Sequence, residues 1–206
     1  MIHVASHAEN TLIRTQLKQN RVLGDMRAAD LAELERHLLI VDCDKGDFLL
    51  HQGSDIMEQY FILDGILKCV VTDPQSHEMI LRFAVEGDID GSYVAWRLKV
   101  PAQYSIVSVT RARVAKLPIP QWVALLDGRA ELKARFEFEL MHLMSDIMGH
   151  AITLHLLDGP GRMHLLRQDP ALFMRMSKKE LAAYLNLCPE TLSRLKHEGE
   201  IGMAEK

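Results

Sequence analysis

The spacing of hydrophobic residues along the chain changes twice, and each change marks a different kind of structure. Residues 10–19 and 27–39 have apolar positions at helical spacing, and Asp30 lies in the first turn of the second segment. From residue 40 to residue 117 the pattern becomes short apolar runs separated by turn residues. Many short strands with glycine at the turns predict an antiparallel sandwich or barrel.

The strands of this region are predicted from runs rich in aliphatic and aromatic residues. Asp64-Gly65 lies between two of them and predicts a hairpin that joins 60–63 to a return strand at 66–72. The stretch around Gly91 is predicted as a loop. The remaining predicted strands are 48–51, 78–85, 104–110 and 113–117.

Helical spacing returns with a short helix at 120–126 and then one long helix from Ala130. A helix of about 28 residues extends ~42 Å. Five of its apolar residues follow one another at spacings of 4, 3, 4 and 3, which is an a/d seam: Leu140, Met144, Ile147, Ala151 and Leu154. Such a seam packs against another apolar surface, either the same helix of a second copy of the chain or the chain's own β domain.

The long helix is predicted to end at the breakers Asp158-Gly159-Pro160-Gly161, which would form a hinge. A short helix at 163–167 and a connector at 169–173 follow. Gly149, inside the long helix, is a second weak point, because glycine costs about 1 kcal/mol relative to alanine in a helix. The chain before and after residues 158–161 is therefore expected to form separate parts.

Two short helices with a tight turn are predicted near the C-terminus. Ser177 and Glu180 have the spacing of a capping box at the start of the first helix. Residues 186–188 interrupt the helical period, and Pro189 suits the first position of the second helix. The polar face of that helix carries Glu190, Ser193 and Arg194. This arrangement is typical of a helix-turn-helix DNA reader, the alternative being a surface helical hairpin with its charges in solvent.

The segment at 176–196, MSKKELAAYLNLCPETLSRLK, resembles the DNA-binding motif of the Crp/Fnr family of bacterial transcription regulators. Its run at 189–194, Pro-Glu-Thr-Leu-Ser-Arg, is the specific part of the match. The β region resembles the effector domain of the same family, a β-jelly roll like those that bind cyclic nucleotides. The residues that carry this second resemblance are Lys45-Gly46-Asp47, Gln52-Gly53, Phe61-Ile62-Leu63-Asp64-Gly65 and Glu86-Gly87-Asp88-Ile89.

The resemblance implies an α+β chain with three parts. They are a jelly-roll sensor domain with N-terminal helices at 1–128, a long dimerisation helix at 129–158, and a helix-turn-helix domain at 159–206. Most family members continue into a β-wing after the reading helix. Residues 197–206 are too few for a packed hairpin, so the chain resembles a wingless member.

The resemblance also assigns roles in DNA binding. Glu190, Ser193 and Arg194 would read base edges in the major groove, where glutamate can accept from cytosine N4 and arginine can bind guanine O6 and N7. The residues that would hold phosphates are Ser177, Lys178, Thr191 and Lys196. The implied partners are double-stranded DNA, a second copy of the chain and RNA polymerase. The alternative is a small-molecule sensor or protein-interaction module that has lost specific DNA binding.

The predicted effector pocket departs from the members that bind cyclic AMP. Those members place a glutamate for the ribose after the Gly-Asp turn, and an Arg-Ser pair for the phosphate further along. Here Ser92 holds the glutamate position, and no arginine lies between Arg97 and Arg111. A phosphodiester would lack a compensating cation, which argues against cyclic AMP. The pocket residues are predicted as Gly91, Ser92, Tyr93, Gln103 and Tyr104, for an unknown, less charged effector. The alternative is that the aromatic rings fill the core.

Charge is distributed unevenly along the chain. The formal net charge is −4 over 206 residues, whereas residues 161–196 hold seven basic and three acidic residues, a net charge of +4. A small positive lobe on an acidic body suits a modular DNA binder. No apolar run reaches the ~18 residues of a membrane span, and the N-terminus lacks the pattern of a signal peptide, so a cytoplasmic protein without membrane contact is expected.

Cysteine and histidine spacing argue against cofactor and metal chemistry. Cys43, Cys69 and Cys188 are too dispersed for a disulfide framework, a four-ligand metal site or an iron–sulfur cluster. The ten histidines leave haem as an alternative, since axial histidines have no reliable spacing. His51 and His77 alone do not supply the metal set of a jelly-roll enzyme. We therefore predict no enzyme, no metal and no cofactor.

Overall fold

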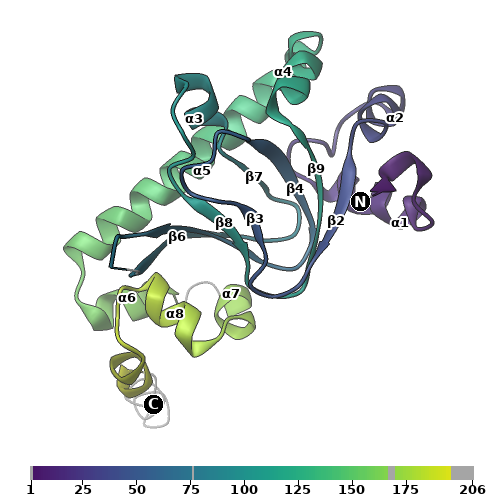
Figure 1. Cartoon of the computed structure of the whole chain (residues 1–206). Helices are drawn as coiled ribbons and strands as arrows, with labels where there is room; N and C mark the ends of the chain where they lie inside the picture. The colour runs from purple at the N-terminus through teal and green to yellow at the C-terminus, as the bar shows by residue number, and fades with distance from the viewer. Residues whose placement is uncertain (1, 76, 167–169, 196–206) are drawn as a thin grey trace. The chain divides into compact units, whose positions relative to one another are not determined.

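The computed structural model, shown in Figure 1, describes residues 2–75, 77–166 and 170–195, without the side chains of 170–172. Lys196, one of the predicted phosphate contacts, and the segment at 197–206, which carries the wingless prediction, lie outside the described residues.

The chain forms two compact units. The first comprises Met1–Val71 and Phe83–Met144, and the second comprises Thr72–Arg82 and Ser145–Lys206. The long helix α5 (Ala130–Leu156) begins in the first unit and ends in the second. The predicted three-part division of the chain stays a prediction.

The β-strands form two sheets, with the orders β1-β2-β9-β4-β7 and β3-β8-β5-β6. Their bounds are β1 (Ile2–His3), β2 (Leu39–Cys43), β3 (Phe48–Leu50), β4 (Glu58–Asp64), β5 (Leu67–Thr72), β6 (Glu78–Ala84), β7 (Ile89–Gly91), β8 (Ser105–Ser108) and β9 (Ala112–Pro118). The strand pairs described within the first unit are antiparallel; β4, for example, pairs with β9 from Glu58↔Pro118 to Asp64↔Arg113. The predicted fold class, a β-sheet domain followed by helices, is confirmed.

The predicted hairpin at Asp64-Gly65 is wrong, because β4 and β5 belong to different sheets. Gly65 has a φ of +88°, and its N–H donates to Glu86 Oε1 at 2.8 Å. A Cβ at Gly65 would lie 2.7 Å from Ala112 Cα, a distance that real Cβ atoms do not show. The glycine therefore lets the chain pass close to β9 while it crosses from one sheet to the other.

Among the described residues before α5, the α-helices are α1 (Asn10–Gln19), α2 (Ala28–Glu35), α3 (Tyr93–Leu98) and α4 (Ile119–Asp127), and a 3₁₀ turn lies at Val4–Ser6. The predicted loop around Gly91 is wrong, because it contains the end of β7 and the start of α3. The predicted helix at 27–39 also runs too far, since Leu39 is already the first residue of β2. Leu39 fits the apolar spacing of the helix before it and that of the strand after it, so the spacing alone does not show where α2 ends and β2 begins.

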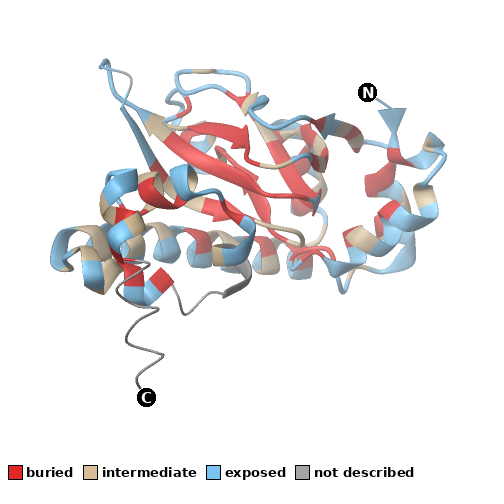
Figure 2. Cartoon of the chain, turned by 90° about the horizontal axis from the view of Figure 1, so that it is seen from below, coloured by how far each residue is buried: buried red, intermediate tan, exposed pale blue. Residues whose placement is uncertain are grey.

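An aromatic cluster joins the strands to the helices in the first unit. The ring of Trp122 in α4 contacts Phe61 in β4 and Phe136 in α5, both edge to face, with centroids 5.3 and 5.4 Å apart. Tyr93 in α3 contacts Phe136 in the same way at 5.0 Å. Phe61, Trp122 and Phe136 are buried, and Figure 2 shows that buried residues follow the strands. This cluster fixes the first part of α5 on the β domain.

The second unit contains α6 (Gly159–Leu166), α7 (Pro170–Arg175), α8 (Lys178–Tyr184) and a helical segment at 189–195. The predicted connector at 169–173 is wrong from residue 170 onward, where α7 begins with a proline, as helices tolerate. The unit has a small apolar core. Its buried residues include Met163, Leu166, Met176, Leu181, Ala182, Leu185, Leu192 and Leu195.

Candidate nucleic-acid interface and sensor site

The first helix of the predicted reader, α8, begins with the expected cap. Ser177 has an extended backbone, with φ −68° and ψ 154°, and its Oγ accepts a hydrogen bond from the Glu180 N–H at 3.2 Å. This bond satisfies one of the N–H groups that a helix start leaves without an intrahelical partner. Ser177 thus has a structural role beside the phosphate contact predicted for it.

The turn between the two reader helices centres on Asn186, which has a φ of +50°. Asparagine tolerates this left-handed conformation better than most residues. The Asn186 N–H donates to Ala183 O at 3.2 Å, and the Leu187 N–H donates to Ala182 O at 2.9 Å, so the last carbonyls of α8 are used. The chain then enters the next helix, where the Leu192 N–H donates to Cys188 O.

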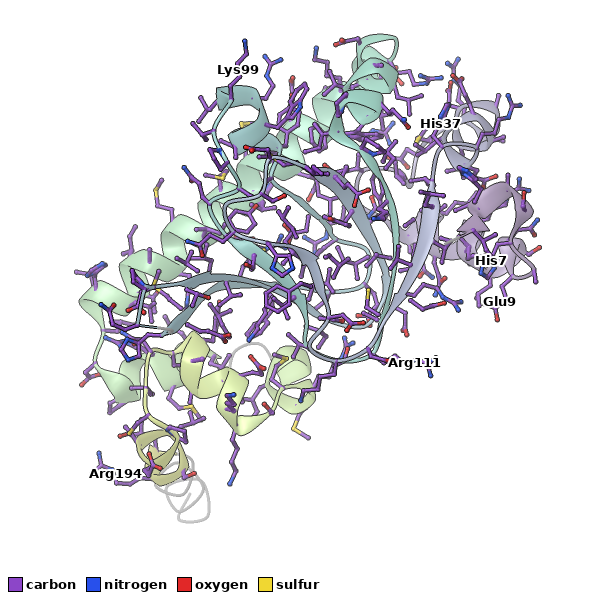
Figure 3. The ribbon with its side chains drawn as sticks, viewed as in Figure 1. His7, Glu9, His37, Lys99, Arg111 and Arg194 are labelled. Carbon is purple, nitrogen blue, oxygen red and sulfur yellow. The ribbon has the colours of Figure 1, made fainter. Side chains whose placement is uncertain are left out.

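The second reader helix separates an apolar side from a polar one. Leu192 and Leu195 are buried, whereas Glu190 and Arg194 are exposed. Glu190 and Arg194 are four residues apart on one helix, so they lie on the same face. Figure 3 labels Arg194 on this helix. An acid and an arginine on one exposed helix face can together reach base edges in a major groove.

The other predicted DNA contacts differ in exposure. Ser193 is half-buried beside the exposed pair, and Lys178 is exposed in the first turn of α8. Thr191 is half-buried, with its Oγ1 3.0 Å from the Cys188 sulfur. The structure thus presents Glu190, Arg194 and Lys178 most openly, and their roles at DNA stay predictions.

His150 is a residue that the sequence did not single out. Its ring stacks on Tyr184, the last residue of α8, with centroids 3.9 Å apart and planes 4° from parallel. Burial lowers the pKa of His150 below its ordinary value; backbone groups at Tyr184 and Ile80 oppose the shift, and the charge of Arg162 adds to it. The ring of His150 therefore joins α5 to the reader within the second unit.

The predicted effector residues are only partly brought together. The Tyr104 hydroxyl donates to Gly91 O at 2.9 Å. Gly91 has a φ of +149°, and a Cβ there would lie 2.7 Å from Glu58 O, so only glycine fits. Ser92 is buried, and its Oγ has no hydrogen-bond partner among the residues that the structure describes.

The other two predicted pocket residues lie in different surroundings. Tyr93 packs on Phe136, as the alternative of a core ring describes, and Gln103 is exposed. Asp90, the residue before Gly91, is a buried carboxylate. Its Oδ2 accepts from Cys69 Sγ at 2.9 Å, and its Oδ1 accepts from the Gly91 N–H at 2.7 Å. The assignment of an effector pocket stays a prediction.

The predicted seam of α5 is only partly exposed. Met144 and Ala151 are exposed, whereas Leu140, Ile147 and Leu154 are half-buried. A second apolar stripe is more open, and its members with their exposed fractions are Phe138 (55%), Met141 (63%), Met148 (64%) and Ile152 (50%). Met141, Met148 and Ile152 each follow a predicted seam residue by one position. The exposed stripe therefore lies about 100° around the helix from the predicted seam.

Neither a metal-ligand cluster nor a membrane-spanning helix is found among the described residues. Within the part of the chain that the structure describes, no group of three or more His, Cys, Asp or Glu residues is placed to hold a metal ion. Among the same residues, no helix combines the length and apolar character needed to cross a bilayer.

Comparison with known proteins first identifies a class of domain in the β region of the chain. Residues 40–129 match the family described as Cyclic nucleotide-binding domain. Over 190 residues the chain is 24% identical to the nitrogen fixation regulation protein FixK of Bradyrhizobium diazoefficiens, covering 86% of this chain and 78% of the relative.

Solved structures share the fold over most of the chain. The structure of FixK2 from Bradyrhizobium japonicum has a TM-score of 0.70 at 14% identity and covers 80% of this chain and 85% of its own. A putative transcriptional regulator of the Crp/Fnr family from Eubacterium rectale has a TM-score of 0.68 at 12% identity and covers 89% and 88%. These structures show that the chain shares their fold, and the domain match and the FixK relative support the predicted resemblance to the Crp/Fnr family.

Proposed function

We propose that this protein is a DNA-binding transcription regulator that acts as a homodimer and senses a small molecule in its β domain. The observation that carries the proposal is the second reader helix, where Glu190 and Arg194 are exposed on one face while Leu192 and Leu195 are buried. On the second helix of a helix-turn-helix, this exposed face is the one that can reach base edges in a major groove. The FixK relative is named as a regulation protein, which supports the same function.

The proposed dimer forms along α5. Four large apolar side chains, those of Phe138, Met141, Met148 and Ile152, are at least half exposed in the single chain. A contiguous apolar stripe of this kind marks an interaction surface. The spacing of these four residues is compatible with a coiled-coil seam. Met144, a residue of the predicted seam, would lie at the border of this surface. A dimer would present two readers to two half-sites, as helix-turn-helix proteins usually do.

The proposed sensor is the β domain, with a ligand other than cyclic AMP. Ser92 stands where the cyclic-AMP-binding members of the family have a glutamate, and its buried hydroxyl has no partner among the described residues. A buried hydroxyl without a hydrogen-bond partner costs free energy, and a ligand that donates a hydrogen bond to it or accepts one from it removes this cost. Contact with RNA polymerase and a location in the cytoplasm belong to the same proposal.

The proposal is tested by selecting binding sites from random duplex DNA with the purified full chain. We expect an inverted repeat whose half-site centres lie about 10–10.5 base pairs, or a multiple of this, apart. Binding should weaken steeply with salt, with a slope of about −0.9 for each phosphate contacted. Sequences no different from the starting library would contradict DNA reading and favour the alternative of a sensor or interaction module.

A further inference from the structure

Arg162 connects the end of α5 with the turn between the two reader helices, two segments that a free hinge would leave independent. It lies in the first turns of α6, just after the predicted hinge at 158–161. Its Nε donates to Leu157 O at 2.8 Å, and its Nη2 donates to Leu154 O at 2.6 Å. Its Nη1 donates to Leu185 O at 3.1 Å and lies 3.4 Å from Asn186 O. One guanidinium thus holds the end of α5 and the turn of the reader.

Both sets of carbonyls are places where a cation is favourable. The last four carbonyls of a helix lack intrahelical partners, and the helix dipole makes them negative. Leu154 is in the last turn of α5, and Leu185 follows the last residue of α8. Arginine suits this position because its planar group offers five donors in a fixed geometry, whereas lysine offers one compact charge.

Arg162 is more than a cap for α5. A helix cap accounts for the bonds to Leu154 and Leu157, but the bonds to Leu185 and Asn186 reach a segment 23 or 24 residues further along the chain. Two further observations in the second unit place the reader next to α5 and α6. His150 of α5 stacks on Tyr184, and a Cβ placed on Gly159 would lie 3.4 Å from Leu195 Cδ1. The start of α6 therefore lies near the second reader helix.

We propose that Arg162 is a positioning residue for DNA reading, which sets the direction of the reader relative to the end of α5. The inference rests on the proposed function. In a dimer joined along α5, the orientation of each reader fixes the separation of the two half-sites that the protein can bind at once. Because α6 already begins at Gly159, only Leu157 and Asp158 separate it from α5; these two residues then form the joint, and Arg162 limits its rotation.

The test measures how affinity depends on half-site separation. Duplexes carry the two selected half-sites with the central spacer changed in steps of one base pair. The proteins compared are the wild type, Arg162→Gln, Arg162→Lys, and the control Arg36→Gln. Arg36 is an exposed arginine in the first unit, so its replacement changes the net charge equally without touching the joint.

We expect the wild type and Arg36→Gln to share one sharp optimum. Arg162→Gln should lose at least tenfold in affinity at that optimum and much less at the neighbouring spacers, so its profile becomes flat. The affinity profile of Arg162→Lys should lie between those of the wild type and Arg162→Gln, because an ammonium group can reach one set of carbonyls but not both. If Arg162→Gln does not fold, the comparison of Arg162→Lys with the wild type decides the question.

Two results would overturn the inference. If the variants lose affinity equally at every spacer, with the wild-type optimum kept, Arg162 only stabilises the fold; a lower unfolding temperature would accompany this result. If the profiles are unchanged, the joint does not orient the reader. A wild type without any optimum would instead contradict the proposed function itself, and the inference with it.

Discussion

Replacing Arg194 with alanine should lower the affinity for the selected operator at least tenfold while the dimer stays intact. A bidentate arginine–guanine pair contributes about 1–3 kcal/mol of discrimination, and a dimer makes two of them. Each 1.4 kcal/mol corresponds to a factor of about ten in the dissociation constant. Arg194 is exposed beside two buried leucines, so its removal leaves the core of the reader in place. Fluorescence anisotropy with a labelled duplex measures the affinity, and sedimentation measures the dimer.

Two controls separate base reading from general charge. Arg36→Ala removes the same charge from an exposed position in the first unit and should leave operator affinity unchanged. Arg194→Ala should bind a scrambled duplex about as well as the wild type does, since the loss concerns sequence reading. An equal loss on operator and scrambled DNA would reassign Arg194 to phosphate binding. No loss on either would remove it from the interface.

Replacing Phe136 with alanine should lower the free energy of unfolding by about 3–5 kcal/mol, the range measured for large aromatic truncations in protein cores. Phe136 is buried and contacts the rings of both Trp122 and Tyr93, so the truncation opens a cavity where α3, α4 and α5 meet. Urea unfolding followed by tryptophan fluorescence measures the change, because Trp122 is in the cluster.

The matched control is Phe48→Ala, which removes the same side chain from a position that is half exposed. Surface substitutions of this kind usually change stability by less than about 0.5 kcal/mol, apart from the stacking of Phe48 on His51. Equal effects of the two substitutions would show that the aromatic cluster does not hold α5 on the β domain.

Local signals in the sequence predicted most elements of the fold, and contacts distant in sequence explain the errors. Asp64-Gly65 has the composition of a hairpin turn, but the position of Gly65 against β9 sends the chain to the other sheet. Leu39 fits a helix pattern and a strand pattern equally well, and pairing with Lys116 decides for the strand. No window of sequence contains these partners.

The residues of the candidate sites also divide into those that a local motif predicts and those whose contacts depend on packing between distant elements. Ser177, Glu190 and Arg194 could be singled out because a helix-turn-helix is a local motif with fixed spacing. Arg162 and His150 could not, because their contacts with the reader depend on how α5, α6 and α8 pack. The α5 face was predicted one residue away from the most exposed stripe, since apolar residues surround the helix on several sides.

The central claim is that two copies of the second reader helix enter the major groove of one duplex, and methylation protection of the selected operator tests it most directly. Dimethyl sulfate methylates guanine N7, an atom that lies in the major groove and that Arg194 would contact. We expect protected guanines in two half-sites about 10–10.5 base pairs apart, and we expect this protection to be lost in Arg194→Ala. Full reactivity of every guanine in a saturated wild-type complex would contradict it.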